Sequence, residues 1–183
     1  HSCSQVMVPV LCAKNRPLTK IALLSDYFVI LSVLSLIGMY ISSDFSRLEI
    51  DLGGCLENYK YFRSMLKDST RLLVLVKANA YGHGAVQFAS VMEKAGANYL
   101  AVAYPVEGME LRQAGIKSPI MVLTAGTDSF GGIVSYGLEP GIPNMYALRI
   151  LCDVLEERGV TDYPIHIKLD TGMPRLGFMT DEL

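Results

Sequence analysis

Short apolar runs that alternate with amphipathic segments are the feature of this sequence that most constrains its fold. Leu72-Leu73-Val74-Leu75-Val76 is a continuous apolar run, as expected for a strand that is covered on both faces. Further strand-like runs follow at 99–103, 120–123 and 165–170, and helical patterns separate them. Strands that alternate with helices at this spacing predict a parallel sheet built from strand–helix–strand units.

The intervening segments carry apolar residues at helical spacing and recognisable ends. We predict helices at 53–67, 84–95, 106–114, 128–136 and 144–158. Gly96 is a stop signal for the second helix, and Asn144 is expected to cap the last one. The residues expected to face the core in these two helices are Ala85, Phe88, Ala89 and Met92 in the second, and Met145, Leu148, Cys152 and Leu155 in the last.

The length of the chain limits how much of a parallel barrel it can contain. A closed barrel of eight strand–helix units needs about 250 residues, whereas this chain has 183. Only about five strands fit between Leu72 and Leu183. The expected fold is therefore α/β: a partial (β/α)8 barrel that is truncated after about five strands and occupies residues 47–183.

Residues 1–46 differ from the rest and are expected to form a separate hydrophobic segment or linker. Tyr27 to Ser43 carries no charge, and Asp26 and Asp44 bracket it. Seventeen uncharged residues are at the lower edge of a membrane span, which needs about 20. The alternatives are a linker or buried helix from a preceding domain, and a wrongly read N-terminus.

The composition excludes some classes of function. Lys and Arg total 16 against 18 Asp and Glu, so the chain has no broad basic footprint for nucleic acid. Three histidines, and four cysteines without metal-ligand spacing, predict no metal site.

A first candidate site follows the strand at 72–76. Lys77 ends this apolar run and, by the period of two, shares a face with Leu73 and Leu75. The C-terminal ends of barrel strands hold the active site, and partial burial there favours the neutral amine, which can form an imine. Gly82 and Gly84 permit the close turns of a cofactor-binding loop. The alternative is a strand-end lysine that reaches water.

A second candidate site lies at 165–178. Alternation places Ile165, Ile167 and Leu169 on one face of the strand. The other face carries His166, Lys168 and Asp170, which is costly in a barrel unless these groups are paired or used. An exposed edge strand is the alternative. Arg175, between Gly172 and Gly177, could present its guanidinium to a carboxylate or phenolate, or be an ordinary surface arginine.

Two strings carry a resemblance to a known family. Val76-Lys77-Ala78-Asn79-Ala80-Tyr81-Gly82-His83-Gly84 resembles the pyridoxal phosphate attachment motif of alanine racemases, and the string at 166–178 resembles that family's other barrel signature. Segments 49–52, 99–103 and 107–116 are similar to its intervening parts. The runs at 136–140 and 162–166 look most like the racemase half of Bacteroidetes-type bifunctional proteins, in which a muramoyl-peptide ligase domain lies upstream.

The resemblance implies a function and roles for four residues. It implies interconversion of L-alanine and D-alanine, which supplies D-alanine for peptidoglycan. Lys77 would form an internal aldimine with pyridoxal 5'-phosphate and act as a base, and Tyr81 would bind the cofactor phosphate. Arg175 would lie near the cofactor oxygen and the substrate carboxylate. Lys168 matches a lysine that some members carbamylate, which would turn a cation that repels Arg175 into an anion that orients it.

The resemblance also implies features that differ from this chain or lie outside it. Pro174 replaces the small or polar residue that usually precedes the arginine, which could alter the approach of Arg175. The opposing catalytic tyrosine and a C-terminal β-domain would lie beyond Leu183, so we expect the chain to be inactive in isolation. A cytoplasmic homodimer is implied for the complete protein.

Three other interpretations stay open. One is a membrane-tethered serine or alanine racemase, another is a non-catalytic pyridoxal phosphate-binding barrel protein, and the last is an α/β fragment that binds no ligand.

Overall fold

The computed structural model describes residues 6–8, 48–173 and 175–179. The chain divides into two compact units, residues 1–12 with 52–183, and residues 13–51. The uncharged stretch from Tyr27 to Ser43 lies outside the described residues. Among the described residues, no helix has both the length and the apolar character that crossing a membrane requires. The first unit contains both candidate sites.

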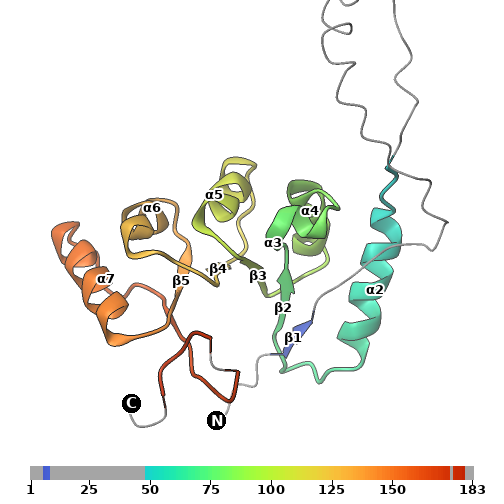
Figure 1. Ribbon diagram of the computed structural model, residues 1–183. Helices are drawn as coiled ribbons and strands as arrows, with labels where there is room; N and C mark the ends of the chain where they lie inside the picture. Colours follow the sequence, from blue (N-terminus) through green and yellow to red (C-terminus); the bar gives the residue numbers. More distant parts are fainter. Residues whose placement is uncertain (1–5, 9–47, 174, 180–183) are drawn as a thin grey trace, which may run out of the picture. The chain divides into compact units, whose positions relative to one another are not determined.

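Over the described residues of this unit, six strands form a parallel sheet, and they follow one another in chain order. They are β1 (Val6–Val8), β2 (Leu72–Leu75), β3 (Tyr99–Val102), β4 (Ile120–Val122), β5 (Glu139–Ile142) and β6 (His166–Ile167). Every neighbouring pair is parallel. The predicted α/β class is confirmed, and the five strands from β2 onward form the predicted partial barrel (Figure 1).

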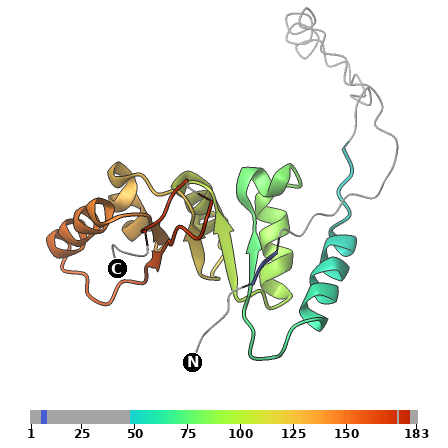
Figure 2. The same ribbon diagram turned by 60° about the horizontal axis from the view of Figure 1, so that its bottom comes forward.

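Helices connect consecutive strands and lie side by side along one face of the sheet (Figures 1 and 2). They are α2 (Leu52–Ser64), α4 (Ala85–Lys94), α5 (Pro105–Gln113), α6 (Phe130–Ser135), which follows the short 3-10 turn η2 (Thr127–Ser129), and α7 (Met145–Glu157). All five correspond to predicted helices, with ends that differ by one to three residues. A further short element, α3 (Lys77–Tyr81), comes directly after β2.

The two faces of the sheet have different surroundings. Alternate strand residues such as Val74, Val102 and Val122 are fully buried against the helices in the larger hydrophobic cluster. The intervening residues form a smaller cluster on the opposite face, which is the inner face of the partial barrel: Leu73, Leu75, Ala101 and Met121, with Tyr99 and Leu123 packed against them. The inner face is therefore the surface toward which Lys77 was expected to point.

The local signals at helix ends are confirmed, and the buried face of α7 was predicted in part. Gly96 has a φ of +88°, and the side chain of Asn144 accepts a hydrogen bond from the Ala147 amide. In α7 the buried residues are Ala147 and Leu151, whereas Met145 and Cys152 are exposed. Leu148 and Leu155 are half-buried and pack against the larger hydrophobic cluster, so two of the four residues expected to face the core do so.

Strand β5 was not predicted as a strand, because Pro140 and Gly141 are both unfavourable in strands. All four of its residues are buried, since it lies between β4 and β6. This short strand accommodates Pro140, and Gly141 lies beside the side chain of Lys168.

Candidate functional site

The two candidate lysines lie at the same edge of the sheet. Lys77 directly follows Val76, whose amide donates to the Ala101 carbonyl at the C-terminal end of β2. Lys168 follows β6 by one residue, and its Nζ donates to the carbonyl oxygen of Leu123, just beyond the end of β4, at 3.2 Å. The C-terminal edge of a parallel sheet is where ligands bind in barrels and other α/β folds.

The loop that carries Lys77 has an unusual backbone conformation. Ala78, Asn79 and Ala80 have φ of 51–53° and ψ of 45–50°, and Tyr81 has a φ of 55°. The element α3 is therefore a turn of left-handed helix, closed at its end by Gly82 with a φ of 88°. Left-handed helical conformation costs an L-residue about 1–2 kcal/mol. Four such residues cost roughly 4–8 kcal/mol in total, so contacts with the surroundings must hold the turn.

Two side-chain hydrogen bonds join the turn to the helices beside it. The Ala78 amide donates to Oε1 of Glu107, the third residue of α5, at 2.6 Å. The next residue, Asn79, accepts through its Oδ1 from the amide of Ala85, the first residue of α4, at 2.7 Å. Asn is one of the few residues that tolerate left-handed conformation, and here it also caps the following helix.

The turn brings Lys77 and Tyr81 together. The Nζ of Lys77 lies 5.8 Å from the centroid of the Tyr81 ring. The side chain of Lys77 is half-buried, and Tyr81 is 40% exposed, so both can be reached from solvent at this edge. A right-handed helix would place residues four apart on one face as well. Here the left-handed turn brings Lys77 and Tyr81, which are also four residues apart, together at the end of strand β2.

Lys168 is half-buried on the inner face, beside Gly141, where an added Cβ would be crowded. An ideal Cβ at Gly141 would lie 3.3 Å from Lys168 Cδ and 3.1 Å from the Val122 carbonyl oxygen. Burial, and secondarily the positive charge of Arg175, lowers the pKa of Lys168. Both effects favour the neutral amine.

Arg175 lies in a loop that is tied back to the strand from which it leaves. The Phe178 amide donates to the Lys168 carbonyl at 2.8 Å, and the Asp170 amide donates to the Phe178 carbonyl at 2.9 Å. Phe178 is buried in the main core, whereas Arg175 is exposed. Asp170 accepts from the Gly172 amide within the same loop at 2.9 Å. Pro174 lies outside the described residues.

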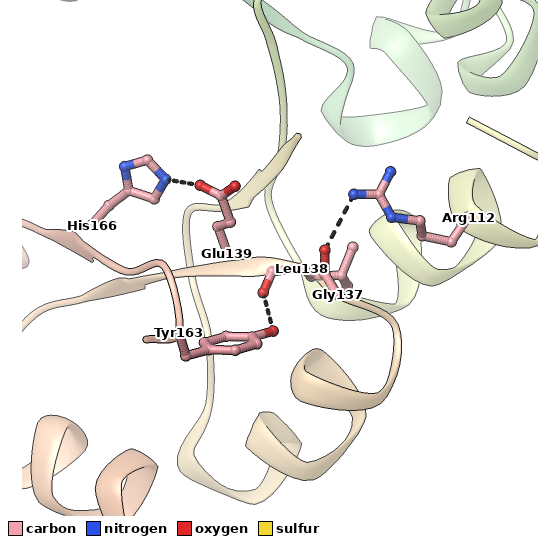
Figure 3. A network of polar contacts seen from close by, with 6 residues as sticks. All are labelled: Arg112, Gly137, Leu138, Glu139, Tyr163 and His166. Atoms are coloured by element: carbon pink, nitrogen blue, oxygen red, sulfur yellow. Dashed lines mark hydrogen bonds and ion pairs between the residues drawn. The ribbon is translucent and has the colours of Figure 1, made fainter. Parts of the chain in front are cut away.

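The polar face of the last predicted strand is paired inside the barrel. His166 Nε2 lies 2.8 Å from Oε2 of Glu139 on β5, and Figure 3 shows the two side chains pointing toward each other. The ring of His166 also meets Tyr99 edge-on, at 5.7 Å between centroids. The interpretation in which these polar groups are paired is therefore correct for His166, and the outward-facing Ile167 and Leu169 are the exposed ones.

Tyr163 fastens the end of α6 to the start of β5 (Figure 3). Its hydroxyl lies 2.6 Å from the Leu138 carbonyl oxygen and 3.1 Å from that of Ile133. Burial, with a smaller effect from the negative charge of Glu139, raises the pKa of Tyr163 to about 12. On the other side of Leu138, Arg112 donates to the Gly137 carbonyl.

Sequence reasoning assigned no role to Glu107 or Glu139. For Glu107 a signal was present, because a Glu two residues after a Pro that starts a helix is typical of an N-terminal capping box. For Glu139 no local signal existed, since its partner His166 is 27 residues away.

Comparison with known proteins finds one consistent similarity. The sequence profile described as "Alanine racemase, N-terminal domain" matches residues 50–183. The alanine racemase of Synechocystis is 40% identical over 132 residues, which are 71% of this chain and 35% of that protein. The alanine racemase of Geobacillus stearothermophilus is 39% identical over 149 residues, 76% of this chain and 37% of the relative. The chain thus spans about a third of the length of the curated relatives that it matches.

Solved structures of alanine racemases are also similar to this chain. The crystal structure of alanine racemase from E. faecalis superposes with a TM-score of 0.67 at 35% identity, over 73% of this chain and 36% of that one. Alanine racemase from Bartonella henselae, crystallised with covalently bound pyridoxal phosphate, gives a TM-score of 0.66 at 25% identity, over 73% of this chain and 37% of that one.

Proposed function

The chain belongs to the alanine racemase N-terminal domain family, and from this premise we propose that the protein interconverts L-alanine and D-alanine with pyridoxal 5'-phosphate as cofactor. The observation that carries the proposal is the left-handed turn after β2, which brings the Lys77 amine to 5.8 Å from the Tyr81 ring at the C-terminal edge of the sheet. A lysine that merely reached solvent would not need so costly a backbone conformation.

The residues at this edge fit the cofactor. Lys77 is half-buried and supplies a primary amine, which can bind an aldehyde covalently. Tyr81 supplies an accessible hydroxyl that can donate to the phosphate, and Gly82 and Gly84, with φ of +88° and +90°, let the backbone turn closely beside it. When bound, the cofactor's ring delocalises the electron pair left on the substrate's Cα after a proton is removed.

Racemisation needs a proton to leave one face of Cα and another to arrive at the opposite face. We assign the first task to Nζ of Lys77, which can take and return a proton on its own side of the substrate. The family resemblance assigns the opposite face to a tyrosine from sequence outside this chain. The activity is accordingly proposed for the complete protein.

Arg175 and Lys168 are assigned to the orientation of substrate and cofactor. We propose that carbon dioxide adds to the neutral amine of Lys168 and forms a carbamate, with release of one amine proton to solvent. The negative charge of the carbamate then holds the guanidinium of Arg175 by charge-assisted hydrogen bonds. The proposal is supported by the lowered pKa of Lys168, since only the neutral amine reacts, and by the positive charge of Arg175, which contributes to that shift.

Four finer proposals rest on the family resemblance alone. The complete protein is a cytoplasmic homodimer, its D-alanine is used for peptidoglycan, and a ligase domain lies upstream in the same polypeptide. Sedimentation of the full-length protein tests the dimer, cell fractionation tests the location, and the full reading frame tests the upstream domain.

The experiment for the main proposal follows the loss of the Cα proton. Full-length protein with pyridoxal phosphate is incubated with L-alanine in D2O, and deuterium at Cα and formation of D-alanine are measured. We expect Lys77→Ala to abolish both, and Lys94→Ala, which removes an exposed lysine at the end of α4, to leave both unchanged. Racemisation that persists in Lys77→Ala, or its absence from wild-type holoprotein, would overturn the proposal.

A further inference from the structure

The Glu107 carboxylate bridges two chain segments that meet at the edge of the sheet. Its Oε2 accepts from the amides of Ala103 and Tyr104, at 2.7 and 3.0 Å, which lie between β3 and α5. Its Oε1 accepts from the amide of Ala78, 29 residues earlier in the chain, at 2.6 Å. Three main-chain donors from two connections therefore meet on one side chain.

The place of the Ala78 amide gives this bridge its significance. Ala78 is the first residue of the left-handed turn and the immediate neighbour of Lys77. The carbonyl of Ala78 is already used within the turn, where it accepts from Gly82 at 3.1 Å. Glu107 thus fixes the peptide unit between Lys77 and Ala78 to the rigid start of α5, because the same carboxylate is held there by two other donors.

A cap for α5 would not require this arrangement. A glutamate at the third position of a helix normally accepts only from the residue that precedes the helix, and Oε2 already does so at Tyr104. The second oxygen is therefore available for the neighbouring connection. Hydrogen bonds from amides to a carboxylate are shorter and stronger than neutral ones, which suits a turn whose conformation L-residues avoid.

We propose that Glu107 is a positioning residue, which holds the left-handed turn and thereby the amine of Lys77 in place for attachment of the cofactor. The proposal rests on the function proposed above for Lys77. Glu107 touches neither the substrate nor the cofactor, and it acts through the Ala78 amide. Its loss should weaken covalent attachment at Lys77 while the sheet and helices stay folded.

The test compares Glu107→Ala with Glu110→Ala, which removes an exposed glutamate from the same helix. Amide hydrogen exchange of the full-length apoprotein is followed in peptides that cover 77–82 and 103–113. In Glu107→Ala we expect exchange over 77–82 to accelerate on the order of tenfold, as loss of a hydrogen bond to a charged group implies. Glu110→Ala should match the wild type.

Cofactor attachment is the second measurement. For each variant, the fraction of Lys77 that borohydride fixes to the cofactor is measured at increasing concentrations of pyridoxal phosphate. The concentration of pyridoxal phosphate that gives half-saturation should rise about tenfold in Glu107→Ala. Glu107→Gln, with one carbonyl oxygen and one amide nitrogen, can keep only one side of the bridge and should fall between. If Glu107→Ala does not fold, the same two measurements on Glu107→Gln decide.

Two results would overturn the proposal. In one, exchange over 77–82 in Glu107→Ala equals that in Glu110→Ala. In the other, only 103–113 loses protection and attachment at Lys77 is unchanged, so Glu107 is simply a helix cap. If wild-type protein fixes no cofactor on Lys77, the proposed function fails, but the exchange comparison still decides whether Glu107 holds the turn.

Discussion

Replacement of Gly177 by alanine should release the loop that carries Arg175. An ideal Cβ at Gly177 would lie 2.6 Å from both the Asp170 amide nitrogen and the Leu169 carbonyl carbon. Both atoms belong to the backbone, so no side chain can move aside. The loop must shift away from the strand, which breaks the two hydrogen bonds that join Lys168 and Asp170 to Phe178.

The magnitude follows from two separate costs. Gly177 has a φ of +146°, and a non-glycine residue in such a conformation costs about 1–3 kcal/mol. Loss of the two hydrogen bonds adds about 1–3 kcal/mol at 0.5–1.5 kcal/mol for each. Gly172 offers a matched control in the same loop, because its φ is +117° but nothing lies within 4 Å of an added Cβ. Gly172→Ala should therefore show the first cost without the second.

The assay is denaturant unfolding of the full-length variants, with hydrogen exchange over 168–178 to localise the change. We expect Gly177→Ala to be less stable than Gly172→Ala by about 1–3 kcal/mol, and to lose protection at the Asp170 and Phe178 amides. Equal stability of the two variants, with both amides still protected, would refute the role given to Gly177.

Three further predictions concern Tyr163, Lys168 and Gly141. The raised pKa of Tyr163, about 12 instead of 10.0, means that its ionisation opposes the folded state. The quantity to compare is the free energy of unfolding of the wild type and of Tyr163→Phe. Their difference should keep its full value below pH 10 and fall by about 1 kcal/mol as the pH approaches 12, after allowance for solvent screening. A difference in urea unfolding that stays constant with pH contradicts this. Lys168→Ala should reduce turnover, and added chloride or a small carboxylate should partly restore it; full activity without anion dependence makes Lys168 an ordinary lysine. Gly141→Ala should displace the Lys168 side chain, so the carbamate signal expected in NMR spectra of the wild type with 13C-bicarbonate should weaken. An unchanged signal contradicts the crowding argument.

The sequence predicted those parts of the fold that depend on regular patterns. Apolar runs such as 72–76 identified β2, and Gly96 and Asn144 marked helix ends, because burial and capping act locally. Strand β5 escaped prediction because Pro140 and Gly141 have low strand propensity. Its place between β4 and β6 outweighs that propensity, and such tertiary context cannot be read from a local pattern.

The candidate site, like the fold, could be predicted from the sequence only in part. Lys77 and Lys168 could be placed at the strand ends by counting residues with a period of two. The left-handed turn could not be predicted, since Ala78, Ala80 and Tyr81 all favour other conformations. It exists because hydrogen bonds of Glu107 and Asn79 join it to the helices beside it, and the contact between Ala78 and Glu107 spans 29 residues.

The most direct test of the account is to locate the cofactor on the chain. Full-length protein is incubated with pyridoxal phosphate, reduced with borohydride and digested with trypsin, which cannot cleave after a modified lysine. The account predicts that the label appears on Lys77, in a peptide that spans residues 72–94 because cleavage after Lys77 is blocked. The label should be absent from Lys77→Ala. A label on Lys168 instead, or a wild-type protein that retains no label, would contradict the assignment of Lys77 as the residue that binds the cofactor.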